Sequence, residues 1–215
     1  MSLPFRRESE ETVRLPALSD GVIAIAITLL VLEITVPEVP AGTPTAVVQA
    51  LVFEQWNEFV GYVLSFLVIG LYWTLHRRIF FHIETHDRGV LWLNLLFLLF
   101  VAFVPYATSV FSRYPGQFGV SFIAGVLALT GVSLALLWIH ASRKQLLVAG
   151  LPTRVVVIQA ARFLASPMVF SASIAVAAVD STWGVLTWLL LVPINGALNS
   201  RLVASFDEEA GGTGP

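Results

Sequence analysis

Six long apolar segments divide this chain, and they restrict its fold more than any other feature of the sequence. A helix needs about 20 mostly apolar residues to cross the hydrocarbon core of a bilayer. With 57% hydrophobic and 12% charged residues, the chain is also far from the composition of soluble domains, which carry about 25% charged residues. The sequence therefore predicts an all-α membrane protein with six transmembrane helices, at Leu18–Val36, Phe59–Leu75, Val90–Val110, Val120–Ile139, Ala160–Val179 and Trp183–Leu198.

Several classes of site are not expected in this chain. It has no cysteine, so it forms neither a disulfide framework nor a thiolate metal site. A net charge of −2 gives no electrostatic footprint for nucleic acid. Phosphate-binding glycine loops, GxSxG elbows and HExxH pairs do not occur, which predicts that the chain is not an enzyme and holds no cofactor. His82 and His86 are spaced for one helix face, but without cysteine a metal site there is not expected.

The positive charges predict the orientation of the helices. Eleven of the twelve Lys and Arg residues fall on one side of the predicted spans, and only Arg113 falls on the other. Positive residues stay cytoplasmic, so both termini are expected on the inside of the cell membrane. We expect one six-helix transmembrane domain, residues 1–203, and a disordered tail, residues 204–215. The eleven residues are Arg6, Arg7, Arg14, Arg77, Arg78, Arg88, Arg143, Lys144, Arg154, Arg162 and Arg201.

The loop between the first two spans contains carboxylates but no Lys or Arg. It carries Glu38, Glu54 and Glu58, and Thr45–Gln55 within it is expected to be a short amphipathic helix on the outer interface. Two interpretations stay open at this point. The carboxylates form a vestibule that attracts cations, or they belong to an ordinary solvated loop.

The first span carries polar residues that a plain membrane anchor does not need. Arg14, Ser19 and Asp20 stand at its start, and Thr28 stands at its middle. Charged groups in such places are usually paired and face protein or water. Simpler roles are also available, because Ser19 and Asp20 suit a helix cap and a Thr28 hydroxyl can bond back to the Ala24 carbonyl.

A second polar group reaches the same depth from the second span. Trp73 and His76 are three residues apart and share one helix face, and they end the second span near the level at which Ser19 and Asp20 start the first. We therefore expect Trp73 and His76 to dock against Ser19 and Asp20. An interfacial Trp in a membrane belt is the alternative for Trp73.

These residues together resemble the transmembrane protein 175 family, the lysosomal potassium channel and its bacterial homologues. The first-helix signature of that family reads Arg-x-x-x-Phe-Ser-Asp, then a small residue and an apolar helix with a central Thr. Leu18 stands where Phe is usual, and Pro16 is atypical. The matching residues are Arg14, Ser19, Asp20, Gly21 and Thr28, followed by Tyr72-Trp73, His76-Arg77 and the run Leu91–Thr108.

The resemblance implies a pore lined by the first helix of each subunit in a homotetramer, without a TVGYG filter. By position, Ile25 forms the tightest ring, Leu29 and Leu32 form further apolar layers, and Thr28 forms a polar ring between them. The permeant ion is K⁺, and the remaining partners are membrane lipids. A structural network is implied to hold the pore helix in place, formed by Arg14, Ser19, Asp20, Trp73 and His76.

The sequence thus favours a potassium-favouring cation channel, and two other functions remain open. A proton-coupled secondary transporter would use Asp20, Glu33 and His76 as carriers. These groups lie near span ends, however, whereas transporter sites lie near the bilayer midplane. In a non-conducting membrane scaffold, the same polar network would be purely structural.

Overall fold

The fold is a bundle of long helices. The computed structural model describes residues 5–200, with side chains described from residue 14 onward, and no strand occurs in that part of the chain. Six of its helical segments are long and apolar enough to cross a membrane, which confirms the predicted all-α fold. The elements are α1 (Phe5–Leu29), η1 (Leu30–Glu33), α2 (Thr45–Glu54), α3 (Trp56–His82), α4 (Arg88–Arg113), α5 (Gln117–Arg143), α6 (Thr153–Ala177), α7 (Ser181–Leu186) and η2 (Thr187–Leu190).

The last span joins several helical pieces. It runs from Ser181 to Ser200 and contains α7, η2 and helical residues 191–200. Asp180 caps its start, because the carboxylate accepts hydrogen bonds from the amides of Thr182 and Trp183. The predicted tail, residues 204–215, lies outside the described residues, as does Arg201. The side chains of Arg6 and Arg7 are likewise outside the described part.

Several helices begin or end away from their predicted positions. The first helix starts at Phe5 rather than near Leu18, so Ser19 and Asp20 lie within it and do not cap its start. Its α-helical part ends at Leu29, and a 3₁₀ turn follows. The second span continues past Leu75 to His82. Apolar length predicts the part of a helix inside hydrocarbon, whereas the helical backbone continues into polar flanks.

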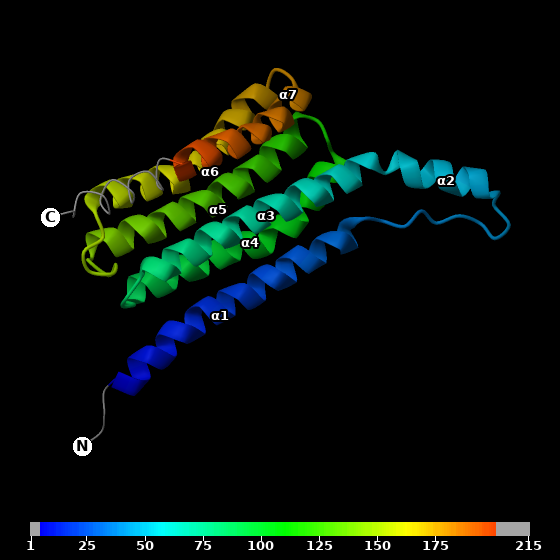
Figure 1. Cartoon of the computed structure of the whole chain (residues 1–215). Coiled ribbons are helices and arrows are strands. Elements are labelled where there is room, and N and C mark those ends of the chain that lie inside the picture. Colours follow the sequence, from blue (N-terminus) through cyan, green and yellow to red (C-terminus); the bar gives the residue numbers. More distant parts are fainter. Residues whose placement is uncertain (1–4, 201–215) are drawn as a thin grey trace.

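The helices are arranged in layers, with α1 at one edge. Figure 1 shows α1 along one side of the bundle, α3 and α4 next to it, then α5, and α6 with the last span on the far side. The α2 helix projects beyond one end of the bundle and has no buried residue. Its bounds match the predicted helix at Thr45–Gln55, while its place on the outer interface stays a prediction.

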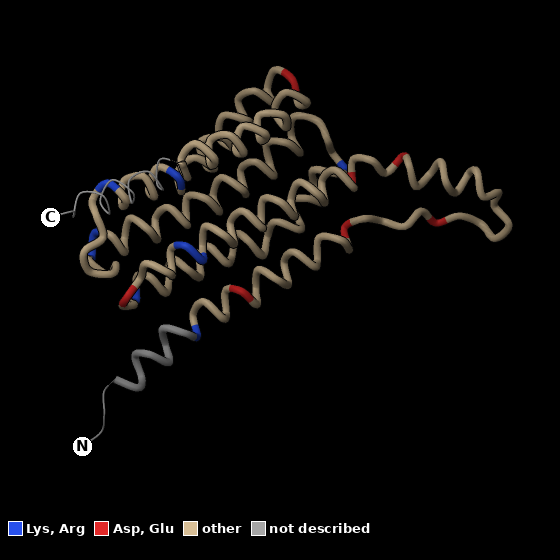
Figure 2. Tube along the Cα trace, viewed as in Figure 1, with Lys and Arg blue, Asp and Glu red and all other residues tan. Residues whose placement is uncertain are grey.

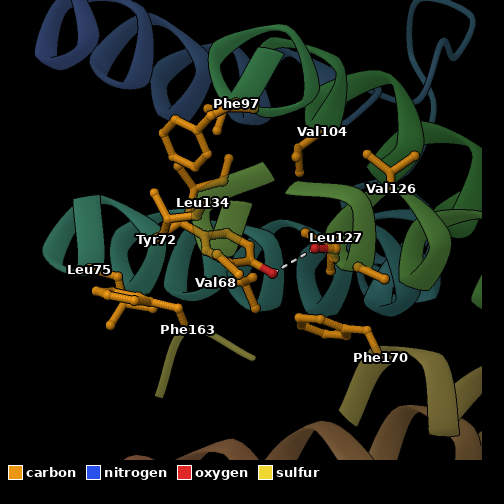
Figure 3. Close-up of a cluster of buried hydrophobic side chains, with 14 of the residues drawn as sticks. Val68, Tyr72, Leu75, Phe97, Val104, Val126, Leu127, Leu134, Phe163 and Phe170 are labelled. Carbon is orange, nitrogen blue, oxygen red and sulfur yellow. Dashed lines mark hydrogen bonds between the residues drawn. The ribbon is translucent and has the colours of Figure 1, made fainter. Parts of the chain in front are cut away.

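The core lies between α3, α4, α5 and α6. Figure 3 shows Tyr72 of α3 lying among Phe97, Leu134 and Phe163, with its hydroxyl donating to the Leu127 carbonyl over 2.6 Å. All of these residues are almost fully buried. A buried tyrosine needs such a partner for its hydroxyl, so this bond ties α3 to the centre of α5.

Positive charge is concentrated at one end of the bundle. Figure 2 shows the described Lys and Arg residues gathered at one end, here called the basic end, with Arg113 as the exception. The start of α1 and the end of the last span lie at this same end. Positive residues favour the cytoplasmic side, so the predicted orientation places the basic end inside the cell.

Candidate functional site

One face of α1 and of the η1 turn that continues it has no packing partner among residues 14–200. Ile25 is 60% exposed and Leu32 is 74% exposed, and both Thr28 and Leu29 are also exposed. These four are the residues predicted to line the pore. Their exposure leaves an apolar stripe with a single polar residue along the length of the helix.

The opposite face of α1 and η1 is buried against its neighbours. Ser19, Ile23, Ala26 and Leu30 recur at helical spacing and are all nearly inaccessible. They pack on α3 and α4, the two helices that α1 contacts most. The burial pattern therefore fixes the rotation of α1 and leaves the Ile25 face outward.

Thr28 satisfies its own hydroxyl within the helix. Its Oγ1 donates to the Ile25 carbonyl over 2.9 Å, rather than to the Ala24 carbonyl that we considered from the sequence. Such bonding back to the preceding turn is common for threonine in helices. The hydroxyl oxygen keeps acceptor capacity on the exposed face.

A buried polar network fixes the inner face of α1. Asn94 of α4 donates through Nδ2 to Ser19 Oγ over 2.9 Å, and its Oδ1 lies 2.8 Å from His76 Nε2 on α3. Ser19 Oγ also donates to the Leu15 carbonyl over 2.9 Å. Ser19, His76 and Asn94 are all nearly inaccessible, so each needs these partners. Three helices are joined through one amide.

A second contact joins α1 to α3 at the exposed edge of their interface. The Trp73 indole N–H donates to Asp20 Oδ1 over 2.8 Å, and the Arg77 guanidinium lies 5.0 Å from the centre of the Trp73 ring. Trp73 and His76 thus meet the first helix at the level that the sequence predicts. Trp73 reaches Asp20 directly, whereas His76 reaches Ser19 only through Asn94.

Arg14 lies apart from this network. No hydrogen bond or ion pair joins it to the predicted network residues within residues 14–200. It lines a pocket of about 490 Å³ together with Leu18, His86, Asp87 and Leu91. The role of Arg14 in holding the pore helix therefore stays a prediction.

Asn94 is not among the site residues predicted from the sequence, although a signal for it is present. Asn94 is the only amide in the apolar run Leu91–Thr108, and a polar residue inside a span is usually satisfied by a partner. Glu58 was assigned to a vestibule or a solvated loop. In the structure its Oε2 accepts from the Thr35 amide over 2.8 Å, and Gln55 Nε2 donates to the Thr35 carbonyl. The segment after α1 is therefore held at the opposite end from the Asp20–Trp73 contact.

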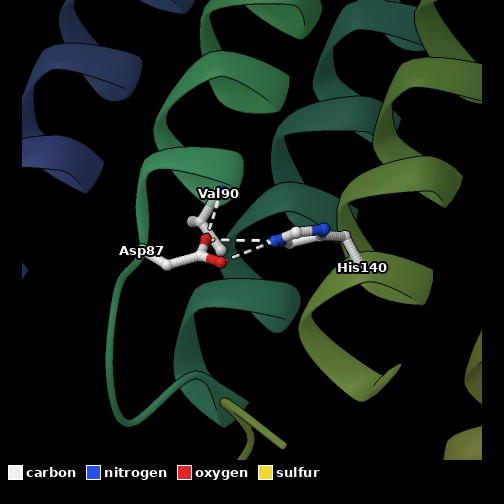
Figure 4. A network of polar contacts seen from close by, with 3 residues as sticks. All are labelled: Asp87, Val90 and His140. Carbon is white, nitrogen blue, oxygen red and sulfur yellow. Dashed lines mark hydrogen bonds and ion pairs between the residues drawn. The ribbon is translucent and has the colours of Figure 1, made fainter. Parts of the chain in front are cut away.

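Asp87 and His140 form another polar contact at the basic end. Figure 4 shows the Asp87 carboxylate facing the His140 ring, 2.9 Å from Nε2, while it accepts from the Val90 amide over 2.8 Å. Burial raises the pKa of Asp87, but the hydrogen bonds from Val90 and His140 outweigh it and hold this pKa below its ordinary value. Burial likewise lowers the pKa of the neighbouring His86. Among the described residues, no group of three His, Asp or Glu side chains is placed to hold a metal ion.

The helices that carry this network resemble those of known proteins. The family model described as the endosomal/lysosomal potassium channel TMEM175 matches residues 14–105. A potassium channel of Chamaesiphon minutus is 36% identical over 146 residues, which cover 66% of this chain and 71% of that protein. The chain belongs to the TMEM175 family. A potassium channel of Streptomyces collinus is 43% identical over 138 residues, covering 62% of this chain and 66% of that protein.

The TMEM175 match extends to the whole bundle when structures are compared. The crystal structure of a lysosomal potassium-selective channel TMEM175 homologue from Chamaesiphon minutus superposes with a TM-score of 0.72 and 27% identity, covering 88% of this chain and 99% of that one. The human endosomal/lysosomal proton channel TMEM175 is 37% identical over 114 residues, 47% of this chain and 22% of the human protein. The fold of the second half is therefore shared even though the family model stops at residue 105.

Proposed function

We propose that this protein is a subunit of a potassium-favouring cation channel whose pore is lined by the exposed face of α1. One observation carries the proposal: α1 and the η1 turn after it are packed and hydrogen-bonded along one side, while Ile25, Thr28, Leu29 and Leu32 stay exposed on the other. The potassium-channel names of the bacterial relatives support it. The multi-pass fold places the protein in the cell membrane.

A pore requires several copies of the chain. One six-helix unit with a single pore helix at its edge cannot enclose an axis, and closed cyclic symmetry is the usual solution. We propose a homotetramer in which four α1 helices surround the axis. Mass determination in nanodiscs tests this assembly: a mass of four chains is expected, and a stable monomer would contradict it.

The apolar ring accounts for gating and for modest selectivity. A narrow hydrophobic constriction gates by dewetting, because it cannot replace the hydration shell of an ion. When the ring at Ile25 widens, partly hydrated K⁺ passes more easily than Na⁺, whose hydration shell is held more strongly. The Asp20–Trp73 and Ser19–Asn94–His76 contacts hold α1 on its scaffold while the exposed face moves or wets.

A liposome flux assay separates the channel from its competitors. A channel dissipates a K⁺ gradient without a coupled ion, a proton-coupled transporter requires a counter-gradient, and a scaffold does neither. We expect uncoupled K⁺ flux, slower Na⁺ flux, and Rb⁺ and Cs⁺ flux at least equal to that of K⁺. Equal K⁺ and Na⁺ flux would remove the selectivity claim.

Proton permeation is a second candidate, because the human relative is named as a proton channel. The same liposomes loaded with a pH-sensitive dye measure it. A pH change driven by a proton gradient alone, beyond that of empty liposomes, would support it.

A further inference from the structure

Two arginines from different helices meet at the basic end of the seam between α3 and the last span. Arg78 lies in the final turns of α3, and Arg162 lies on α6. Both donate through Nη1 to Oδ1 of Asn199, over 3.4 Å and 3.0 Å respectively. Because the two guanidinium groups share one acceptor atom, they lie close to one another. All three side chains are half-buried, so water reaches them only in part.

The positive charge at this point has no counter-charge in the described chain. Asn199 is neutral, and no Asp or Glu within residues 14–200 lies within 4.0 Å of Arg78 or Arg162. The Nε of Arg162 is shielded from solvent and has no acceptor within residues 14–200. Two like charges in a medium of low dielectric repel, and an unpaired buried donor is costly. The geometry is therefore suited to an anion with several acceptor oxygens.

A phosphate group has the chemistry that this pair can recognise. The planar guanidinium donates two parallel hydrogen bonds to phosphate oxygens, and two arginines offer enough donors for one phosphate and its ester oxygens. A pocket of about 320 Å³ leaves room for the group on the Arg78 side of the pair, where its lining adds a hydroxyl and a second guanidinium but does not include Arg162. It is formed by Thr74, Arg77, Arg78 and Phe81.

An apolar groove lies along the same seam, and its lining ends two turns from Arg78 on α3, at Leu71, and one turn from Asn199 on the last span, at Asn195. It has a volume of about 480 Å³ and lies between α3 and the last span. On α3, Leu71, Thr74 and Arg78 follow one another at helical spacing, so the groove and the arginine share one face. The groove is open along its outer side, because two of its lining side chains are largely exposed: Leu67 by 61% and Val192 by 74%. The groove is lined mainly by Leu64, Leu67, Leu71, Trp188, Val192 and Asn195.

The groove lies below the arginine pair along the membrane-spanning part of α3. Its α3 lining begins at Leu71, about 10 Å from Arg78, and continues to Val60, about 27 Å from Arg78, so it crosses the middle of the helix. We propose that the seam binds one anionic phospholipid of the inner leaflet, with its phosphate on Arg78 and Arg162 and one acyl chain along the groove. Lipid binding at this site does not require ion conduction, so it can be tested independently of the proposed channel function.

Lipid binding to the purified full chain tests the site. Native mass spectrometry after delipidation compares phosphatidylglycerol with phosphatidylcholine of the same acyl chains. We expect tighter binding of phosphatidylglycerol, by about fivefold for each arginine. The preference should fall to about twofold or less in the double variant Arg78→Gln, Arg162→Gln. Arg143→Gln removes the same charge from an exposed position at the basic end and should keep the preference.

Further arms separate the possible occupants. Leu67→Trp fills the groove and leaves the arginines intact, so it should weaken the binding of both lipids while their ratio is kept. An unchanged affinity in Leu67→Trp would overturn the acyl-chain site. Equal binding of both lipids to the parent chain, or an undiminished preference in the double arginine variant, would overturn the phosphate site. Displacement of phosphatidylglycerol by millimolar inorganic phosphate would assign the arginines to a soluble anion. Loss of the lipid on oligomerisation would assign the groove to a second copy of the chain.

Discussion

The first span, Arg14–Glu33, and α5 are about equally apolar, yet they pack in the bundle in different ways. In the most apolar part of α5, 67% of the residues are buried inside the chain, against 28% in the first span. Buried α5 residues are spread around the helix, whereas those of α1 are confined to one side. Apolar content thus shows that a helix lies in the membrane, and the distribution of burial shows which helix is left to face a partner or a pore.

A truncation in each helix sharpens this comparison and should give the largest difference in stability. Leu127→Ala on α5 removes a fully buried side chain, which is expected to cost about 2–5 kcal/mol. Leu32→Ala on the exposed face is expected to change stability by less than about 0.5 kcal/mol. Thermal unfolding in detergent measures both. Similar losses in the two variants would mean that Leu32 is buried in the assembled protein and does not face a pore.

Removal of the Asn94 amide, which joins three helices, should cause the next largest loss of stability. Asn94→Ala leaves His76 Nε2 without its buried partner, at a cost of about 1–3 kcal/mol, and removes the Asn94 bond to Ser19, which keeps its bond to the Leu15 carbonyl. Asn57→Ala, an exposed amide at the start of α3, is the matched control and should change the midpoint little. If Asn94→Ala unfolds like the control, the network does not fix α1.

Acidification should weaken the Asp87–His140 contact by a smaller amount. The pKa of Asp87 is lower in the folded than in the unfolded chain, so its contribution is complete above the ordinary aspartate pKa and is lost as the pH falls through the lowered one. For a partly exposed pair we expect about 1 kcal/mol or less. Unfolding midpoints between pH 6 and pH 3 should fall less in Asp87→Asn, which can still cap α4, than in the parent chain. Parallel pH profiles would contradict this.

The sequence predicts the parts of the fold that depend on local chemistry. Hydropathy predicts six helices, and polar residues within the spans predict that Trp73 and His76 approach Ser19 and Asp20. It does not predict which α4 residue bridges Ser19 and His76, because Asn94 is selected by the crossing of three helices. For the same reason the meeting of Arg78 with Arg162 was not foreseen, since their helices are distant in sequence. The exposed face of α1 agrees with the residues implied by the family resemblance, while their role in permeation stays a prediction.

The most direct test of the proposed pore is the substitution Ile25→Asn, measured as the K⁺/Na⁺ reversal potential under bi-ionic conditions. The control is Val31→Asn, also exposed but about 120° round the helix from Ile25. If four copies of Ile25 form the narrowest ring, Asn should wet it, so current per assembled channel rises and K⁺/Na⁺ discrimination falls, while Val31→Asn keeps the parent discrimination. Unchanged discrimination in an assembled Ile25→Asn channel would show that this face of α1 does not line the pore.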